Sequence, residues 1–404
     1  MQRVVIIGSG QGGYQMAASL RQDGFAGSVT LIGEEPGLPY QRPPLSKAYM
    51  ADGDASRVLL KPESFYERAS ISVVADRVTT IDRRAQAVLT EGGERHPYDH
   101  LVIATGSRPL RPAIAGLEVE GVLQLRTLAD AARLRDSLSG CRHAVVIGGG
   151  FIGLEFAAVA RGMGVGVTLV EAGPRLMARA LSPEMSAHFL AAHRDMGTEV
   201  LLDAMVVSVD QVDGRALGVT LRDGRMIAGD LILLAAGVCP NAELAADAGL
   251  PVANGVVVDA DLLTADPAIS ALGDCANFPA ADGTPIRLES VQAAVDHARH
   301  ISRRLTSDAR APYDAVPWFW SDQGDLKLQI AGIGANADER IVIDQDGVPM
   351  VLCFRDGRLE AVETINAPGQ HIAARKLIGV PLELLKETGF DLKAAAKSAA
   401  GKSP

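Results

Sequence analysis

The chain has 404 residues, which suggests about two or three domains and leaves ample length for a buried core. Apolar residues make up 48% and charged residues 22%, a composition typical of a folded protein that excludes disorder for most of the chain. The formal net charge of −10 disfavours non-specific binding to nucleic acid, so we expect no nucleic-acid partner.

The apolar runs are short. The longest, residues 231–238, falls far below the ~20 residues that cross a bilayer, so we expect no membrane span. A strand-like run already begins at Arg3 and leaves no room for a secretory leader, which predicts a cytoplasmic protein. The 4 cysteines form no C-x-x-C pair, and we expect inert core thiols rather than disulfides or a dithiol relay.

The N-terminal segment has the pattern of a strand–helix–strand unit. An apolar run at residues 3–8 leads into a glycine-rich turn, residues 8–13, and then into a helical stretch. A second strand, residues 28–33, ends beside Glu34. A later apolar run into glycine, residues 101–106, closes the unit.

The same order recurs in the middle of the chain. A strand at residues 143–148 leads into the turn 148–153, a helix, and a strand that ends at Glu171; residues 231–237 close this second unit. Gly148, Gly150 and Gly153 keep the spacing of Gly8, Gly10 and Gly13. Two dinucleotide-binding folds are therefore expected in one chain.

Residues after Pro317 alternate between apolar and polar, as antiparallel strands do, and are followed by a helix near residues 371–378. The tail after Leu392 lacks an apolar stripe, and we expect it to fray. The predicted fold class is α/β, with two Rossmann-like dinucleotide-binding domains and a C-terminal α+β domain. The first dinucleotide domain takes residues 1–112 and 240–316, the second takes 113–239, and the C-terminal domain takes 317–404.

Each glycine turn follows a strand, opens a helix and precedes an acidic residue about 20 residues further on. The glycines allow a tight turn and the close approach of a pyrophosphate to the helix N-terminus, and the carboxylate accepts hydrogen bonds from ribose hydroxyls. A 2′-phosphate beside Glu171 would meet like charge, so NADH is favoured over NADPH. Arg175, four residues beyond Glu171, is the residue that could compensate.

Further motifs occur in a fixed order. They are the runs RPPLSK at residues 42–47, ATG at 104–106, VIGGGFIGLE at 146–155, LGDC at 272–275, ESVQ at 289–292 and PWFWSD at 317–322. Together with the first glycine turn, they resemble the FAD-dependent ferredoxin reductases of the putidaredoxin reductase type, within the glutathione reductase-like two-dinucleotide flavoproteins. The resemblance implies an enzyme whose first domain holds FAD and whose second holds NADH. It also implies that single electrons pass to a 2Fe–2S ferredoxin that serves a cytochrome P450 or a Rieske-type oxygenase.

The resemblance also implies the cofactor-binding residues. For FAD they are Gly8, Gly10, Gly13, Glu34, Arg42, Lys47, Ala104, Thr105, Gly106, Gly273, Asp274, Glu289, Ser290, Val291 and Trp320. For NADH they are Gly148, Gly150, Ile152, Gly153, Glu171 and Gly237. Asp274 takes the family's position at the ribityl chain, with a helix N-cap as the alternative.

Three residues are implied to tune the reaction. Lys47 would stabilise the negative charge of the reduced flavin, together with the N-terminus of a helix expected over residues 289–295. Glu155 would face the nicotinamide and pair with Lys47, and Trp320 would lie at the flavin edge. The alternatives are solvated surface charges for Arg42 and Lys47, an exposed helix carboxylate for Glu155, and a core anchor for Trp320.

Phe151 stands where relatives commonly carry tyrosine, which removes a phenol from the nicotinamide side. The run QRPPLS at residues 41–46 offers no redox cysteine, which excludes a dithiol mechanism of the glutathione reductase type. His297 and His300 form one helical pair without a third ligand nearby, so no metal site is expected.

An acidic reductase needs a local cationic surface to bind an acidic ferredoxin quickly. The candidates are Arg299, Arg303, Arg304 and Arg310, and an ordinary solvated helix face is the alternative. Two other functions stay open. One is an NADH–rubredoxin reductase, which differs only in its acceptor, and the other is a flavin-binding signalling protein that turns over poorly.

Overall fold

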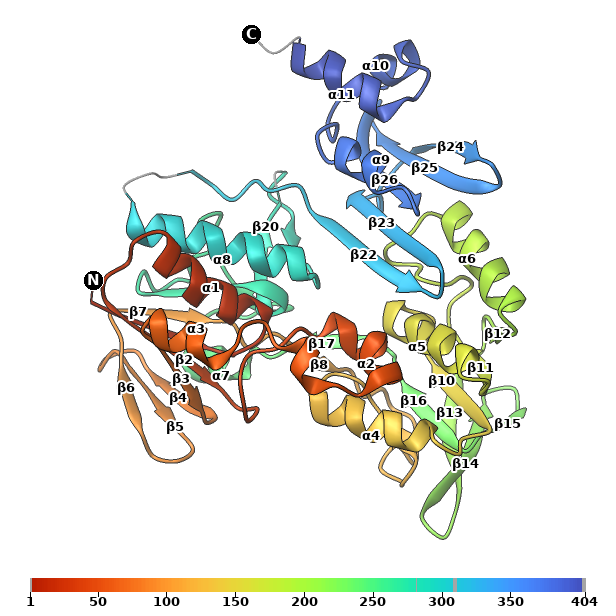
Figure 1. The fold of residues 1–404 in the computed structure, drawn as a ribbon, viewed down its shortest axis with the longest axis horizontal. Helices are drawn as coiled ribbons and strands as arrows, with labels where there is room; N and C mark the ends of the chain where they lie inside the picture. Colours follow the sequence, from red (N-terminus) through yellow and green to blue (C-terminus); the bar gives the residue numbers. More distant parts are fainter. Residues whose placement is uncertain (1, 281, 308–310, 402–404) are drawn as a thin grey trace. The chain divides into compact units, whose positions relative to one another are not determined.

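A computed structural model describes residues 2–280, 282–307 and 311–401 (Figure 1). The chain divides into two compact units. The first unit comprises Met1–Arg42, Asp54–Arg108 and Val238–Ala315, and the second comprises Pro43–Gly53, Pro109–Gly237 and Val316–Pro404. The proline-rich segment that carries Lys47 therefore belongs to the second unit.

The first unit is built on a parallel sheet with the strand order β19-β7-β1-β2-β3. Its strands are β1 (Arg3–Ile7), β2 (Ser28–Gly33), β3 (Ile71–Ala75), β7 (His100–Ile103) and β19 (Ile269–Ala271). The central strands are mostly apolar, with residues 4–7 of β1 and 101–103 of β7 buried, because both faces of the sheet are covered there. Helices α1 (Gln11–Gln22) and α8 (Val291–Thr306) pack against each other over it (Figure 1).

Smaller elements surround this sheet. An antiparallel ribbon comprises β4 (Val78–Asp82), β5 (Ala87–Thr90) and β6 (Arg95–Pro97). The short strands are β8 (Ser107–Pro109) with β17 (Val238–Pro240), and β18 (Val256–Val257) with β20 (Ala276–Pro279) and β21 (Pro285–Ile286). The remaining helical segments are η2 (Ala55–Val58), α3 (Glu63–Arg68), α7 (Glu243–Asp247) and the turn η3 (Gly273–Cys275).

The second unit contains another parallel sheet, with the order β12-β11-β10-β16-β9. Its strands are β9 (Val122–Leu123), β10 (His143–Ile147), β11 (Gly166–Val170), β12 (Glu199–Leu201) and β16 (Leu231–Leu234). A ribbon of β13 (Val206–Val212), β14 (Arg215–Leu221) and β15 (Met226–Ala228) follows. The helical segments are η1 (Pro43–Ser46), α2 (Ala48–Asp52), α4 (Leu128–Leu138), α5 (Phe151–Gly162) and α6 (Pro183–Asp195).

The same unit carries an antiparallel sheet with the order β22-β23-β26-β25-β24. Its strands are β22 (Trp318–Gln323), β23 (Leu326–Gly332), β24 (Glu339–Gln345), β25 (Val348–Arg355) and β26 (Arg358–Ile365), and its helices are α9 (Pro368–Ala374), α10 (Leu382–Glu387) and α11 (Leu392–Gly401). The expectation of a fraying tail is wrong for residues 393–401, which belong to α11, and residues 402–404 lie outside the described residues. Leu392 and Ala395 are fully buried in the core of this sheet and its helices, and their spacing puts both on one face of α11.

Two parallel Rossmann-like sheets and an antiparallel C-terminal domain confirm the predicted α/β class. Cys275 and Cys353 are buried core thiols as expected, whereas Cys141 and Cys239 are half-buried; all 4 are free. Over the described residues, no helix combines the length and the apolar character needed to span a bilayer.

Candidate functional site

The glycine turn of the first unit forms a cradle at the N-terminus of α1. Gly8 has a φ of +107°, and a Cβ there would collide with the carbonyl of Ala104. A Cβ on Gly13 would collide with the carbonyl of Gly8. Gly10, the N-cap, faces open space: among the described atoms, nothing lies within 4 Å of the point where its Cβ would stand. The free amides of the first helical turn can therefore receive a phosphate group.

The second glycine turn repeats this geometry at the N-terminus of α5. Gly148 has a φ of +111°, and a Cβ there would collide with the carbonyl of Ala235, just beyond the end of β16. A Cβ on Gly153 would collide with the carbonyl of Gly148. The surroundings of Gly150 are again open, with no described atom within 4 Å of its absent Cβ. Both cradles fit a dinucleotide diphosphate.

The acidic residue of the second cradle is already fixed. Glu171, directly after β11, accepts hydrogen bonds from the amides of Gly149 at 2.6 Å and Gly173 at 2.7 Å. The guanidinium of Arg175 donates instead to the carbonyls of Leu181 and Ala178 and to Ser186 Oγ, at 2.6–2.9 Å. Through these hydrogen bonds Arg175 holds its own loop in place. They satisfy its guanidinium group, which therefore has partners without a 2′-phosphate.

The predicted residues at the ends of the strands fall as follows. Ala104, Thr105 and Gly106 follow β7, Gly237 follows β16, and Ile152 lies in the first turn of α5. Thr105 Oγ1 donates to the carbonyl of Asn241 at 2.6 Å.

Asp274 lies in the turn η3 and is not a helix N-cap, because Leu272 holds that position. Its carboxylate accepts a hydrogen bond from Ser107 Oγ at 2.7 Å. The amide of Gly273 donates to Nδ1 of His297, at 3.2 Å. Burial lowers the pKa of His297 to about 3, so the ring is neutral and can accept this bond.

The expected helix over residues 289–295 begins later than predicted. Ser290 is the N-cap, with its Oγ accepting from the amide of Ala293 at 3.0 Å, and Val291 is the first helical residue. Glu289 lies outside the helix and pairs at 2.7 Å with Arg287, whose side chain is 8% exposed. Arg287 also donates to the backbone carbonyl of Asp274, which ties the η3 turn to the start of α8.

Arg42 is a paired cation and not a solvated charge. Its guanidinium donates to Glu35 at 2.6 Å and to the hydroxyl of Tyr40 at 3.1 Å. Burial acts to lower the pKa of Arg42, but the charges of Tyr40, Glu35 and Asp274 outweigh this and raise it. Glu34, the predicted ribose acceptor, is exposed at the end of β2 and approaches Arg77 only at 4.0 Å.

Lys47 and Glu155 form the expected pair. Lys47 Nζ lies 2.7 Å from Glu155 Oε2, and Glu155 is only 5% exposed, which rules out an exposed helix carboxylate. Ser46 Oγ donates to the same oxygen at 2.5 Å, and Ser321 Oγ donates to Oε1 at 2.7 Å. Sequence reasoning missed both serines. A lone serine carries no pattern, although Ser46 and Ser321 do adjoin predicted residues.

An aromatic cluster surrounds the start of β22. Phe151 at the N-terminus of α5 packs against Phe319, with ring centroids 4.5 Å apart. Trp320 is half-buried and lies 5.6 Å from Trp318, whose ring is covered by the guanidinium of Arg375 at 4.7 Å. Both tryptophans are half-buried, and Trp318 makes a further ring contact with His371 at 5.3 Å, so Trp318 has the packing expected of an anchor.

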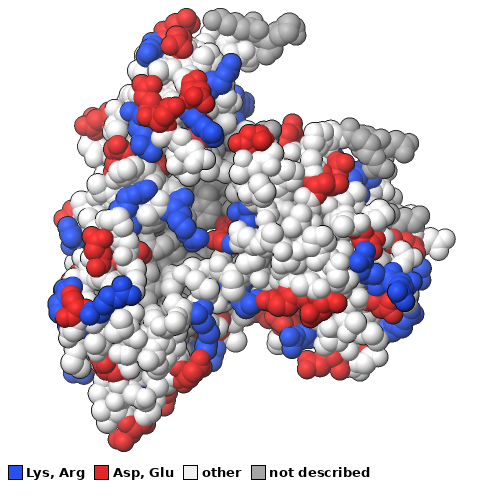
Figure 2. Space-filling model, turned by 180° about the vertical axis from the view of Figure 1, so that it is seen from behind, with Lys and Arg blue, Asp and Glu red and all other residues white. Residues whose placement is uncertain are grey.

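The predicted docking arginines do not share one environment. Arg299 and Arg303 are exposed and lie one turn apart on α8. Arg304 is half-buried, and its guanidinium donates to Ser270 Oγ at 2.6 Å, so it points toward the sheet. Arg310 lies outside the described residues. Basic and acidic side chains intermingle over the face seen in Figure 2, so a net negative charge coexists with local cations.

His297 is packed between Phe278 and Tyr313, with ring centroids 4.7 and 4.6 Å away. Within the described ranges, no cluster of three or more His, Cys, Asp or Glu side chains could hold a metal ion.

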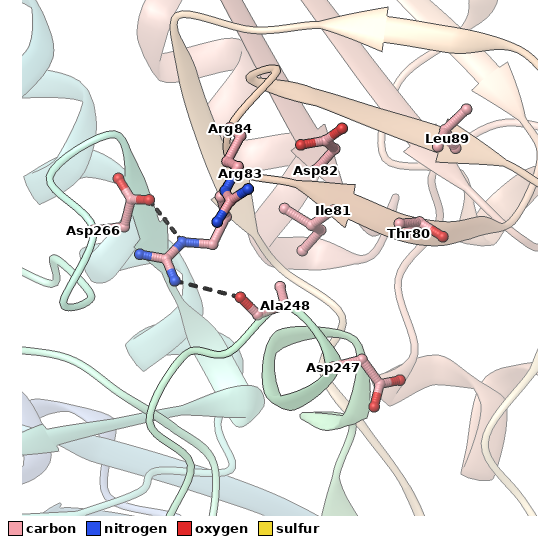
Figure 3. A pocket seen from close by; sticks show the side chains of 9 residues that line it. All are labelled: Thr80, Ile81, Asp82, Arg83, Arg84, Leu89, Asp247, Ala248 and Asp266. Atoms are coloured by element: carbon pink, nitrogen blue, oxygen red, sulfur yellow. Dashed lines mark hydrogen bonds and ion pairs between the residues drawn. The ribbon is translucent and has the colours of Figure 1, made fainter.

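A cavity of 670 Å³ in the first unit lies apart from these residues (Figure 3). It is lined by β4, β5, α7 and Asp266. Arg83 crosses its wall to Asp266 at 2.8 Å and to the carbonyl of Ala248 at 3.4 Å (Figure 3). These contacts anchor the ribbon to α7 and leave no unpaired cation on Arg83 to attract a ligand.

Two family models match this chain. The family model described as pyridine nucleotide-disulphide oxidoreductase matches residues 2–298, and the model described as reductase C-terminal matches residues 318–399. The chain belongs to the pyridine nucleotide-disulphide oxidoreductase family. Within this family it is 47% identical over 402 residues to rhodocoxin reductase of Rhodococcus erythropolis, covering 97% of this chain and 94% of the relative.

Two solved structures of family members are close in fold. The ferredoxin reductase for the CYP199A2 system of Rhodopseudomonas palustris superposes with a TM-score of 0.95 at 43% identity, over 98% of this chain and all of that one. The reductase in the covalent putidaredoxin reductase–putidaredoxin complex gives 0.93 at 34% identity, over 100% of this chain and 99% of that one. The name of this family refers to a disulphide. The Pro43–Gly53 segment of this chain, however, contains no cysteine that could form one.

Proposed function

We propose that this chain is an NADH-dependent ferredoxin reductase that uses FAD and serves a cytochrome P450 or Rieske-type oxygenase. The observation that carries the proposal is the pair of matched glycine cradles, one in each unit, each at a helix N-terminus and each open where a diphosphate would lie. The proposal is supported by the full-length similarity to a rhodocoxin reductase and to a ferredoxin reductase of a P450 system.

We assign FAD to the first unit and NADH to the second. In the first unit, the cradle at Gly8–Gly13 would hold the diphosphate, and Asp274 and Arg42 would provide polar contacts to the rest of the cofactor. When bound, FAD supplies the conversion of a two-electron hydride donor into a one-electron donor.

In the second unit, Glu171 would accept the ribose hydroxyls of NADH. Its position beside Gly149 is supported by two backbone hydrogen bonds, and Arg175 is engaged elsewhere, which favours NADH over NADPH. Lys47 would provide the positive charge that stabilises a reduced flavin, and Glu155 would hold Lys47 in place. Phe151 offers only its ring to this region, so packing and not proton transfer is its role.

The acceptor is a ferredoxin, and we propose that Arg299 and Arg303 contribute to the surface that it meets. Both are exposed on one face of α8, and a cationic surface increases the association rate with an acidic partner. Arg304 is withdrawn from this proposal because its guanidinium is bound to Ser270.

Steady-state turnover with defined acceptors tests the proposal. The purified protein is given NADH and cytochrome c, with and without a 2Fe–2S ferredoxin or a rubredoxin. We expect the ferredoxin to accelerate cytochrome c reduction strongly. A larger acceleration by rubredoxin would assign the acceptor to that class, and absence of turnover with every acceptor despite bound FAD would favour a signalling role.

A further inference from the structure

Three side chains of β22 point to the same side and contact the second dinucleotide-binding domain. Because neighbouring side chains in a strand alternate between its two faces, Phe319, Ser321 and Gln323 share one face. Phe319 packs on Phe151 of α5, Ser321 donates to Glu155 of α5, and Gln323 contacts His193 of α6.

The polar contacts on this face form a continuous series of hydrogen bonds. His193 Nε2 lies 2.8 Å from Gln323 Oε1, Gln323 Nε2 lies 3.1 Å from Ser321 Oγ, and Ser321 Oγ lies 2.7 Å from Glu155 Oε1. His193, Gln323 and Ser321 are each fully buried. Buried polar side chains usually have a defined hydrogen-bond partner, and each of these three has at least one; among the described residues, His193 Nδ1 alone of this set lacks a partner.

The donor and acceptor groups of the side chains determine the direction of each hydrogen bond in this series. Gln323 Oε1 can only accept, so His193 must donate from Nε2 and carry its proton there. Burial lowers the pKa of His193, which keeps the imidazole neutral with one donor nitrogen. In each hydrogen bond of the series, the donor is therefore the group further from the Glu155 carboxylate.

The two oxygens of Glu155 have separate partners. Oε1 receives Ser321, whereas Oε2 receives Lys47 at 2.7 Å and Ser46 at 2.5 Å. Without the Ser321 hydroxyl, Oε1 would be a buried acceptor lacking its donor, and the carboxylate would turn to share its other partners or admit water. Either movement displaces the oxygen that holds Lys47.

We infer that Ser321, backed by Gln323 and His193, is a positioning residue that orients Glu155 and, through Glu155, the Lys47 ammonium. The C-terminal domain thus sets the position of a charge that sits on the proline-rich segment. The inference rests on the proposed function, in which Lys47 tunes the flavin, but the contacts themselves lie within one unit.

The test measures Lys47 directly. FAD-loaded wild-type, Ser321→Ala and Ser321→Thr proteins are pulsed with acetic anhydride, and the acetylation rate of Lys47 is followed by peptide mass spectrometry. Exposed Lys61 serves as the internal reference. We expect Lys47 in Ser321→Ala to be acetylated roughly tenfold faster, because a hydrogen bond to a charged group contributes about one factor of ten or more. Ser321→Thr retains the hydroxyl and is expected to restore the slow rate.

Ser182→Ala is the matched control. Ser182 is also a buried serine of this unit, and it also donates to a buried carboxylate, Glu363, at 2.6 Å. Its loss is expected to destabilise the protein while leaving Lys47 acetylation at the wild-type rate. A second readout is the reduction of the flavin by NADH: Ser321→Ala is expected to lower the limiting rate and leave the NADH dissociation constant unchanged.

Two results would overturn the inference. One is a wild-type acetylation rate in FAD-bound Ser321→Ala, and the other is equal acceleration by Ser182→Ala, which would indicate general loosening. If Ser321→Ala does not fold, Gln323→Met removes the amide that donates to Ser321 and accepts from His193, leaves the Ser321 hydroxyl in place, and is expected to give a smaller acceleration. Failure of the wild-type protein to bind FAD or react with NADH would contradict the proposed function instead.

Discussion

The Glu171 carboxylate lies 2.6 Å from the amide nitrogen of Gly149, inside the second glycine turn. A second hydrogen bond, from Gly173 at 2.7 Å, fixes the other carboxylate oxygen. The carboxylate that we propose as the ribose acceptor is therefore held in place by the backbone, and a 2′-phosphate bound beside it would meet its negative charge.

This arrangement predicts a preference for NADH. We expect kcat/KM for NADH to exceed that for NADPH by about ten- to a hundredfold. The 2′-phosphate of NADPH would repel the Glu171 carboxylate, and the carboxylate would lose the ribose hydroxyl that donates a hydrogen bond to it. Glu171→Gln should narrow the ratio. Glu184→Gln, the same charge change at an exposed position of α6, should preserve it. Equal efficiencies with both nucleotides in the wild-type protein would refute the assignment.

We predict that Asp274 in the η3 turn contributes to the affinity for FAD. Asp274→Ala removes a carboxylate that accepts from Ser107 and sits beside Arg42, so we expect FAD affinity to fall about tenfold or more. Fluorescence titration of the flavin-free protein measures the change. Asp259→Ala, which removes a turn carboxylate bonded to the amides of Asp261 and Leu263, is the control and should bind FAD normally. Unchanged affinity in Asp274→Ala would remove Asp274 from the cofactor site.

Glu363 predicts a pH-dependent stability. Burial raises the pKa of Glu363 from 4.5 to about 7, against the opposing effect of hydrogen bonds from Ser182. The folded protein therefore holds this proton more tightly than the unfolded chain. Its contribution is fully present below about pH 4.5 and is lost as the pH rises through about 7.

Urea unfolding at pH 5 and at pH 8 measures this effect. Relative to Glu363→Gln, which cannot titrate, the wild-type protein should lose on the order of 3 kcal/mol of unfolding free energy between these pH values. Parallel pH profiles for the two proteins would show that Glu363 does not titrate in this range.

The exposed arginines of α8 predict a salt-dependent acceptor interaction. Arg299→Glu and Arg303→Glu should each raise KM for ferredoxin roughly three- to tenfold at low ionic strength, and the effect should diminish as salt screens the charges. Arg95→Glu, the same charge reversal on β6 of the same unit, is the control. An unchanged KM and salt dependence in both α8 variants would place the docking surface elsewhere.

The fold was predictable from sequence because its signals are local. Apolar runs predicted strands at the centres of both parallel sheets, and the glycine turns were predictable because Gly8 and Gly148 adopt conformations that a side chain would strain. The helix start was misplaced by two residues, although Ser290 is a typical N-cap residue. The tail was misjudged because Leu392 and Ala395 form a small stripe that only a packed partner makes stable.

The site was less predictable, because its contacts join distant parts of the sequence. The Lys47–Glu155 pair came from resemblance and not from either residue's neighbourhood. No local pattern marks Ser321 as a donor to Glu155, since any buried strand can carry a serine. Arg304 was grouped with Arg299 and Arg303 by adjacency, but helical periodicity turns it about 100° from Arg303 and toward Ser270.

One measurement tests the central claim most directly, namely that one chain holds a flavin in one cradle and accepts reduced nicotinamide in the other. The purified protein is incubated with FAD, freed of excess cofactor, and titrated anaerobically with NADH while its visible spectrum is recorded. We predict a yellow protein whose flavin absorption disappears with about one NADH per flavin. A correctly folded protein that stays colourless, or that keeps its flavin colour in excess NADH, would contradict the account.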